Sequence, residues 1–203
     1  MSVHTRVAKV AGPGEASARD KRRTPPYRVT LRTMRPGDHP EFFRFPAPEG
    51  RSRESTIVLD AEGRFFHDGE LVAHAKLALA MRRWIRRHPD DGRYILSNGY
   101  DWTYFSVEDV PFFVDGVKLE QDRVVLRLDD ETEEPWNPAE SSVGKGGALY
   151  TKVKRGQDGG PYGARFHRHA QIALAPVLDV DAEGKAGAHI GGRFVVIGAQ
   201  TFG

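Results

Sequence analysis

The chain contains no cysteine among its 203 residues, and its net charge is only +2 at pH 7. The absence of cysteine excludes disulfides, thiolate zinc sites and cysteine nucleophiles. It is typical of a protein that works in a reducing compartment or that is indifferent to redox state. A chain of this length can bury a stable core without disulfide or metal cross-links, as one large domain or as two domains of about 100 residues.

Long apolar runs are absent as well. No stretch of 18 consecutive apolar residues occurs, so the sequence predicts no membrane-spanning helix. Residues 1–23 lack the apolar region that a secretory signal needs. We therefore expect a cytoplasmic protein.

The small net charge hides an uneven distribution. Residues 1–35 carry nine Lys and Arg against two acidic residues, which gives +7 and leaves −5 for the rest of the chain. A basic arm of this kind touches nucleic acid or anionic lipid in some proteins. Because the arm has little hydrophobic patterning, we favour a solvated, disordered leader over a nucleic-acid partner.

Composition and periodicity predict an α+β fold made of two similar small strand–helix–strand subdomains, an internal duplication. Five segments are expected: a disordered basic arm at 1–26, an irregular N-terminal extension with a short strand at 27–54, a first α+β repeat at 55–128, a charged and Gly-rich linker or loop at 129–147, and a second α+β repeat at 148–203. An exposed Trp136 in the linker would indicate a contact surface. The loop 144–147 lacks the spacing of a phosphate loop and is expected to be flexible.

Two helices are expected, one in each repeat. Apolar residues recur at helical spacing from 74 to 85, with Arg82, Arg83, Arg86 and Arg87 near the C-terminal end, where they complement the helix dipole. A second helix is expected from about 164 to 175, ended by Pro176. Strands are expected at 93–97, 102–107 and in a hairpin over 117–128.

The duplication rests on two octapeptides, AHAKLALA at 73–80 and RHAQIALA at 168–175, which agree at five of eight positions. Their shared histidines, His74 and His169, lie near the start of the expected helices, where backbone N–H groups favour an anion. If the repeats pack about a pseudo-twofold axis, the two imidazoles face a shared cleft. In the alternative reading, each histidine caps or packs at its helix start.

The motifs IVLDAEGRFFHDGELVAHAKL, DGRYILS and VEDVPFF resemble those of a bacterial domain-of-unknown-function family, DUF1285. The C-terminal stretches GPYGARFHRHAQIALAPV and GGRFVVIG are similar to the more variable part of that family, so the resemblance covers about residues 53–198. It implies two related α+β subdomains, the second loosely like a pleckstrin-homology fold, and a ligand site of nucleotide type at their junction. It implies no catalytic activity. His74 stands where the family often has arginine, which weakens an anion role at that position.

Basic residues gather at 165–169. Arg165, His167 and Arg168 would oppose the dipole at a helix start, which is unfavourable unless a bound anion compensates. His167 and His169 would point about 200° apart on a helix, since each residue turns about 100°, and this argues against a shared metal. Asp109 is expected to serve a turn.

These patterns predict a non-catalytic ligand-sensing or regulatory protein that holds an anionic small molecule, a nucleotide among the candidates, between its two subdomains. The expected ligand-binding residues are His67, His74, Arg165, His167, Arg168 and His169. No metal, cofactor or catalytic residue is expected. Two alternatives stay open: a histidine-dependent hydrolase or phosphoryl-handling enzyme, and a module that binds nucleic acid or protein through its basic arm.

Overall fold

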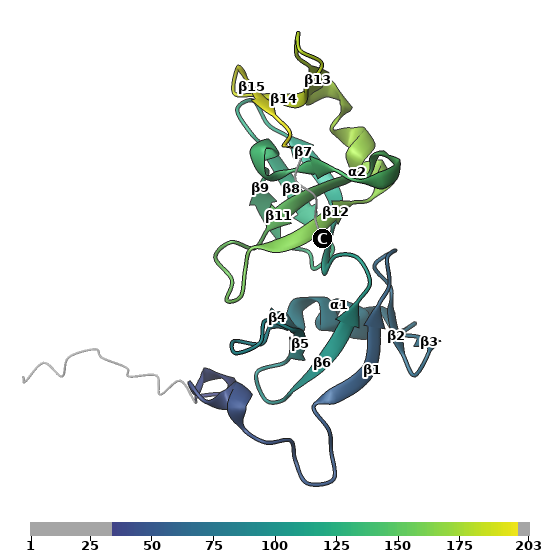
Figure 1. Cartoon of the computed structure of the whole chain (residues 1–203), viewed down its shortest axis with the longest axis vertical. Helices are drawn as coiled ribbons and strands as arrows, with labels where there is room; N and C mark the ends of the chain where they lie inside the picture. Colours follow the sequence, from purple (N-terminus) through teal and green to yellow (C-terminus); the bar gives the residue numbers. More distant parts are fainter. Residues whose placement is uncertain (1–33, 199–203) are drawn as a thin grey trace, which may run out of the picture. The chain divides into compact units, whose positions relative to one another are not determined.

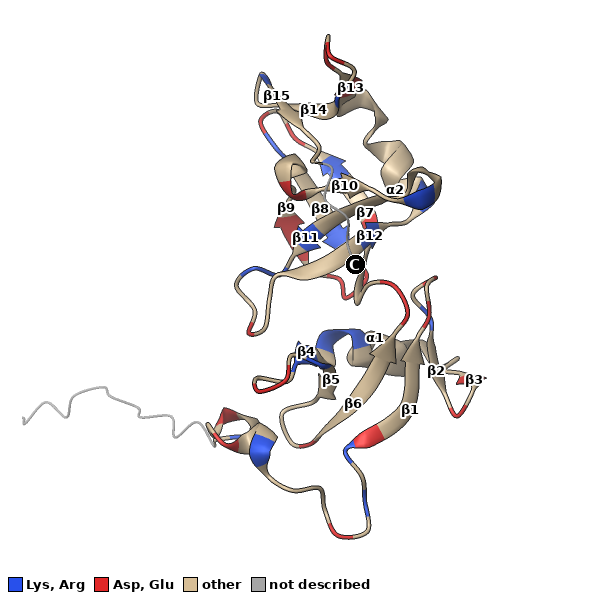
Figure 2. Cartoon of the chain, in the orientation of Figure 1, with Lys and Arg blue, Asp and Glu red and all other residues tan. Residues whose placement is uncertain are grey.

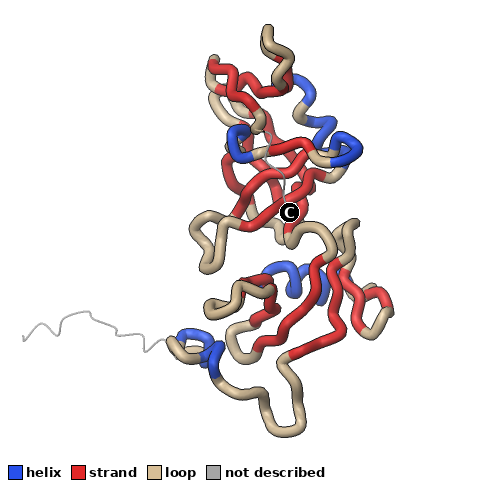
Figure 3. The backbone as a smooth tube through the Cα atoms, in the orientation of Figure 1, coloured by secondary structure: helices blue, strands red, loops and turns tan. Residues whose placement is uncertain are grey.

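The computed structural model describes residues 34–198. Over this part the chain is α+β and mostly sheet, as Figure 3 shows by its long red segments and short blue helices. The α+β class predicted from the sequence is confirmed. The arm at 1–26 and nearly all of the strand expected at 27–34 fall outside the described residues.

The first sheet is built from six strands that surround one helix in the sequence (Figure 1). Its order is β3-β2-β1-β6-β5-β4, and its central pair, β1 and β6, is parallel while the other neighbours are antiparallel. The elements are β1 Glu54–Leu59, β2 Phe65–His67, β3 Glu70–Leu71, α1 Ala75–Trp84, β4 Ile85–Arg87, β5 Tyr94–Ser97 and β6 Trp102–Val107.

The second sheet also has six strands, in the order β10-β11-β12-β7-β8-β9. Its central pair, β7 and β12, is again parallel, and its outer pairs are antiparallel. Its strands are β7 Phe112–Leu119, β8 Val124–Leu128, β9 Glu133–Pro135, β10 Ser142–Val143, β11 Leu149–Val153 and β12 Tyr162–Phe166, and α2 Arg168–Ala173 follows the last of them.

The two sheets share one topology. Numbered within its own sheet, each has the strand order 3-2-1-6-5-4 with a parallel pair at the centre. This likeness is consistent with an internal duplication. The octapeptides that suggested it do not mark equivalent positions, however, because α1 joins the third and fourth strands of the first sheet whereas α2 follows the sixth strand of the second.

A third, antiparallel sheet closes the described chain. It consists of β13 Leu178–Val180, β14 Ala186–Ile190 and β15 Arg193–Val196, in that order. A short 3-10 turn, Ala175–Val177, connects it to α2. The start of this sheet therefore lies next to the second sheet's helix.

Buried side chains of both six-stranded sheets belong to one hydrophobic cluster. Leu59 and Phe65 from the first sheet join Phe112 and Val114 from the second, and Leu174, just after α2, belongs to the same cluster. Full burial of a side chain of this size stabilises the fold by roughly 1.5–3 kcal/mol. The described chain is thus held by a core to which both sheets contribute.

The linker or loop predicted at 129–147 is wrong. β9 pairs with β8, its glutamates appear as the red strand in Figure 2, and short 3-10 turns and β10 follow. Trp136 is only 6% exposed, and its indole Nε1 donates to the hydroxyl of Ser141 at 2.8 Å. Charge alone suggested a linker, but Glu133 is exposed on this edge strand and the half-buried Glu134 accepts the backbone N–H of Lys154.

The boundaries of both helices also differ from expectation. Residues 162–166 form β12, so the second helix starts at Arg168 and ends at Ala173. Arg86 and Arg87 lie in β4, because the chain leaves the helix at Ile85. The strands expected at 93–97 and 102–107 and the hairpin over 117–128 are confirmed, with β7 beginning five residues earlier, at Phe112.

Within residues 34–198, no helix is both long and apolar enough to cross a membrane.

Candidate functional site

A pocket of about 510 Å³ lies where the second sheet, α2 and the start of the third sheet meet. It contains two of the six residues expected to bind ligand, Arg165 on β12 and Arg168 at the start of α2. Its lining consists of Gly146, Gly147, Ala148, Arg165, Phe166, Arg168, Gln171, Ile172 and Leu178.

Gln171 fixes the glycine loop that forms one wall of the pocket. Its side-chain Nε2 donates to the carbonyl of Gly147 at 2.8 Å, and its Oε1 accepts from the backbone N–H of Leu149 at 3.1 Å. Gly146 and Gly147 have φ of 70° and 78°, a conformation that other residues seldom adopt. The loop at 144–147 was expected to be flexible, but the helix ties its backbone in place.

Arg165 is an arginine whose charge is already compensated. Its Nη1 donates to the carboxylate of Asp109 at 3.0 Å, and its guanidinium carbon lies 5.6 Å from the ring centre of Phe113. The hydroxyl of Tyr150 donates to the same carboxylate at 3.1 Å, and burial together with Asp109 raises the pKa of Tyr150. Asp109 was expected to serve a turn, but it orients Arg165 instead.

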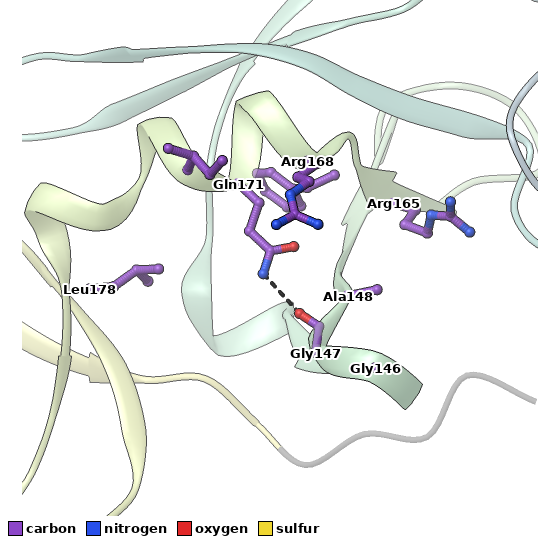
Figure 4. A pocket seen from close by; sticks show the side chains of 9 residues that line it. Gly146, Gly147, Ala148, Arg165, Arg168, Gln171 and Leu178 are labelled. Atoms are coloured by element: carbon purple, nitrogen blue, oxygen red, sulfur yellow. Dashed lines mark hydrogen bonds between the residues drawn. The ribbon is translucent and has the colours of Figure 1, made fainter.

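Arg168 differs from Arg165 in its surroundings. Its side chain is exposed, and it has no hydrogen-bond or ion-pair partner among the residues that the structure describes. Figure 4 shows Arg168 and Gln171 on one face of α2, as residues three apart on a helix are. A guanidinium that protein carboxylates do not engage keeps its five donors for an anion.

His167 and His169 lie together, contrary to the expectation that they point apart. Their rings stack at 5.8 Å with an interplanar angle of 16°, and His167 also stacks on Phe113 at 5.0 Å. His167 is the N-cap of α2, with an extended backbone, so the rotation of 100° per helical residue does not apply to it. Burial lowers the pKa of His167.

The other histidines have local roles. The Nδ1 atom of His74 accepts the backbone N–H of Leu77 at 3.2 Å, so His74 caps α1. His169 Nε2 lies 2.8 Å from the carbonyl of Asp115, and His67 lies 3.7 Å from Asp68. Among the described residues, no contact or pocket joins His74 with His169, so the shared cleft of the two histidines stays a prediction.

A buried charge pair links the first sheet's helix to the second sheet. Arg82 of α1 bonds both the carboxylate of Asp129 and the carbonyl of Gly63, and Gly63 in turn faces the ring of Phe113. The Asp129 side chain is 7% exposed, and its Oδ1 has no hydrogen-bond partner. Burial raises the pKa of Asp129 to about 6 although Arg82 opposes the shift.

Comparison with solved structures identifies the fold of this chain. The chain is similar to the crystal structure of a DUF1285 family protein from Silicibacter pomeroyi DSS-3, with a TM-score of 0.57 and 14% identity over 76% of this chain and 91% of that one. This chain has the DUF1285 fold. A DUF1285 family protein from Shewanella baltica OS155 matches with a TM-score of 0.48 and 16% identity, over 62% of this chain and 94% of that one. No family model and no curated protein matches the sequence.

The resemblance stated from the sequence motifs is therefore confirmed at the level of the DUF1285 fold. Its motifs are structural parts of that fold. The carboxylate of Asp60 accepts the backbone N–H groups of Glu62 and Arg64, and the carboxylate of Asp109 accepts from Arg165. Reasoning from sequence missed Gln171, Leu178 and the loop glycines as pocket residues. The adjacent glycines at 146 and 147 were the available signal, since such pairs mark left-handed backbone.

In the part of this DUF1285 fold that the structure describes, no group of three or more histidine, aspartate or glutamate side chains is arranged to hold a metal ion. The basic arm over residues 1–35, on which the nucleic-acid alternative depends, lies outside the described residues except for Met34 and Arg35.

Proposed function

We propose that this protein is a non-catalytic ligand-sensing or regulatory protein that binds an anionic small molecule in the pocket of Arg165 and Arg168. The observation that carries the proposal is Arg168, an exposed guanidinium in a concave site with no carboxylate partner among residues 34–198. Pockets of roughly 300–1,000 Å³ are typical of small-molecule sites, and this one, at about 510 Å³, falls in that range.

The charges of the pocket favour an anion. Arg165 is paired with Asp109, so the net positive charge comes from Arg168, which no described residue neutralises. The planar fork of a guanidinium matches the oxygens of a phosphate or carboxylate, and such charge-assisted bonds are about twice as strong as neutral ones. A phosphate group is therefore the head group that this pocket suits best.

This proposal moves the site away from the junction of the two repeats. Of the six predicted ligand residues, it keeps Arg165 and Arg168 as binding groups. It assigns His74, His167 and His169 to capping and packing, and it gives the exposed His67, beside Asp68, no part in binding. The same proposal has four further parts, which rest on sequence resemblance and composition. These are a second half loosely like a pleckstrin-homology fold, an ancestral duplication, a signalling role and a cytoplasmic location.

Isothermal titration with inorganic phosphate tests the proposal. We expect Arg168→Gln to weaken phosphate binding about tenfold or more, because a hydrogen bond to a charged group contributes about 1.5–3 kcal/mol. Arg193→Gln, which changes an exposed arginine on β15 outside the pocket, is the matched control and should bind like the wild type. Equal affinity in all three proteins, or no binding of phosphate, pyrophosphate or nucleotide by the wild type, would contradict the proposal.

A further inference from the structure

A second pocket, of about 250 Å³, adjoins the first and has a different chemical character. Its lining comes from β10, β11, α2 and the third sheet with the residue that follows it, and is mostly apolar: Val143, Leu149, Gln171, Leu178, Asp179, Val180, Ala186, Gly187 and Ile197. Gln171 and Leu178 line both pockets. The cationic pocket and the apolar groove therefore meet at these two side chains.

Exposed apolar side chains rim the two pockets. Val143 is 56% exposed and Val180 is 59% exposed in the groove, and Ile172 is 63% exposed in the first pocket. Single exposed apolar residues are normal on protein surfaces, but several around one concave site indicate a surface that something apolar covers. These three side chains come from β10, β13 and α2, which are brought together only by the fold.

Asp179 places a negative charge at the groove end of the two pockets. It lines the apolar groove, where it accepts from the N–H of Val180 at 2.8 Å and faces His189 Nε2 at 3.2 Å. The backbone bond and His189 lower the pKa of Asp179, so its carboxylate is ionised at neutral pH. An anionic group is repelled from this end and attracted at the other end, where the charge of Arg168 is not compensated by any described residue.

We propose that the ligand is a single-chain amphiphile, with an anionic head group in the arginine pocket and a hydrocarbon chain along the Val143–Val180 groove. This inference rests on the proposed function and adds the chemical class of the ligand to it. The complementarity of charge at one end and of apolar surface at the other selects this occupant. The amide of Gln171 is used by Gly147 and Leu149, so the passage between the pockets offers Leu178 to an apolar chain.

A series of alkyl phosphates from methyl to octyl, titrated as monomers below their micellar concentrations, tests the inference. Each buried methylene contributes about 0.8 kcal/mol, which is about a fourfold gain in affinity. We expect affinity to rise with chain length by up to this factor per methylene and to level off when the groove is filled. Arg168→Gln should weaken every member of the series by the same factor.

Two threonine substitutions separate the groove from the head-group site. Val143→Thr combined with Val180→Thr keeps β-branched, exposed residues at these positions and should flatten the dependence on chain length while leaving methyl phosphate binding unchanged. Val196→Thr alters an exposed valine on β15 that does not line the groove, and it should retain the full dependence. Thermal melting of each variant checks that the fold is intact.

The outcomes distinguish this inference from the proposed function. Equal, Arg168-dependent affinities for methyl and octyl phosphate would overturn the amphiphile and leave the anion site standing. No binding of inorganic or alkyl phosphate would overturn both. Octyl phosphate binding unchanged by the two threonines, binding only to anionic vesicles, or self-association through the same valines would each overturn the groove as the site of the chain.

Discussion

At the scale of single residues, the histidines and arginines that look alike in the sequence have different tasks. His74 and Arg168 both lie at the start of a helix, yet His74 uses its ring to accept a backbone N–H, and Arg168 has no partner within residues 34–198. Sequence inspection found both residues. It could not rank them, because only the fold shows that Asp109, 56 positions away, pairs with Arg165 and that no described carboxylate pairs with Arg168.

Removal of the His74 cap should cost stability and leave ligand binding intact. We expect His74→Ala to lower the free energy of unfolding by about 1 kcal/mol, since it exposes an orphan N–H at the first turn of α1. Urea unfolding measures this loss, and His67→Ala, at an exposed strand end, is the control without an effect. A stable His74→Ala protein that loses phosphate binding would restore the histidine to the site.

Asp129 makes stability depend on pH in a defined direction. With a pKa of about 6 in the folded state, above the usual value of about 3.9, the carboxyl binds its proton more tightly when folded. The folded state therefore loses relative stability as pH rises from about 4 to about 6.

Asp129→Asn should remove this dependence. Between about pH 4.5 and about pH 7.5, the wild type should lose about 2 kcal/mol relative to the variant. Urea unfolding of both proteins at the two pH values measures this difference, in which other titrating groups cancel. A difference that does not change, or that changes in the opposite direction, would show that Arg82 keeps the carboxylate ionised throughout.

At the scale of elements, local sequence patterns predict well that a strand exists. They predict poorly where the elements beside the pocket begin and end. The strands over 94–97 and 102–107 alternate or cluster β-branched and aromatic residues, and the structure has them. The helix expected at 164–175 fails in its first part, because Tyr162–Phe166 pairs with both β11 and β7 and tertiary pairing outweighs helix propensity. β9, which pairs with β8, was not predicted, because its two glutamates made the segment read as a charged linker.

Gln171 connects α2 to the glycine loop, so its loss should affect both stability and binding. We expect Gln171→Ala to lower the unfolding free energy by about 1 kcal/mol, to speed amide exchange at Leu149, and to weaken phosphate binding by loosening one wall of the pocket. Gln121→Ala, in the exposed turn between β7 and β8, is the matched control. Unchanged exchange at Leu149 would mean that the loop holds its conformation without the helix.

At the scale of the whole described chain, two sheets of one topology share one hydrophobic core. Sequence resemblance predicted two related halves, but it placed the ligand between them by analogy. The contacts across the halves include the charge pairs of Arg82 with Asp129 and of Arg83 with Glu131, the hydrogen bond from Gln157 to the carbonyl of Ile85, and the approach of Gly63 to Phe113. Only the assembled fold reveals the pocket, because its walls join the glycine loop to β12 and α2, which lie well after that loop in the sequence.

A shared core should make the two sheets unfold together. Trp102 lies in the first sheet and Trp136 follows the second sheet's β9, so variants that retain one of the two, with the remaining tryptophans changed to phenylalanine, report each half separately. We expect coincident thermal transitions in the two variants. Two separate midpoints would show that the halves are independent domains.

Titration of the isotope-labelled wild type with methyl phosphate tests directly whether the anion binds in the pocket of Arg165 and Arg168. The chemical shifts of the backbone amides and of the arginine Nε–H groups are followed. We expect the largest shifts at Gly146, Gly147 and Arg168, with little change at His67 and His74. Shifts concentrated at Arg82, Gly63 and His74, with the loop glycines unmoved, would place the anion between the repeats and contradict the proposed site.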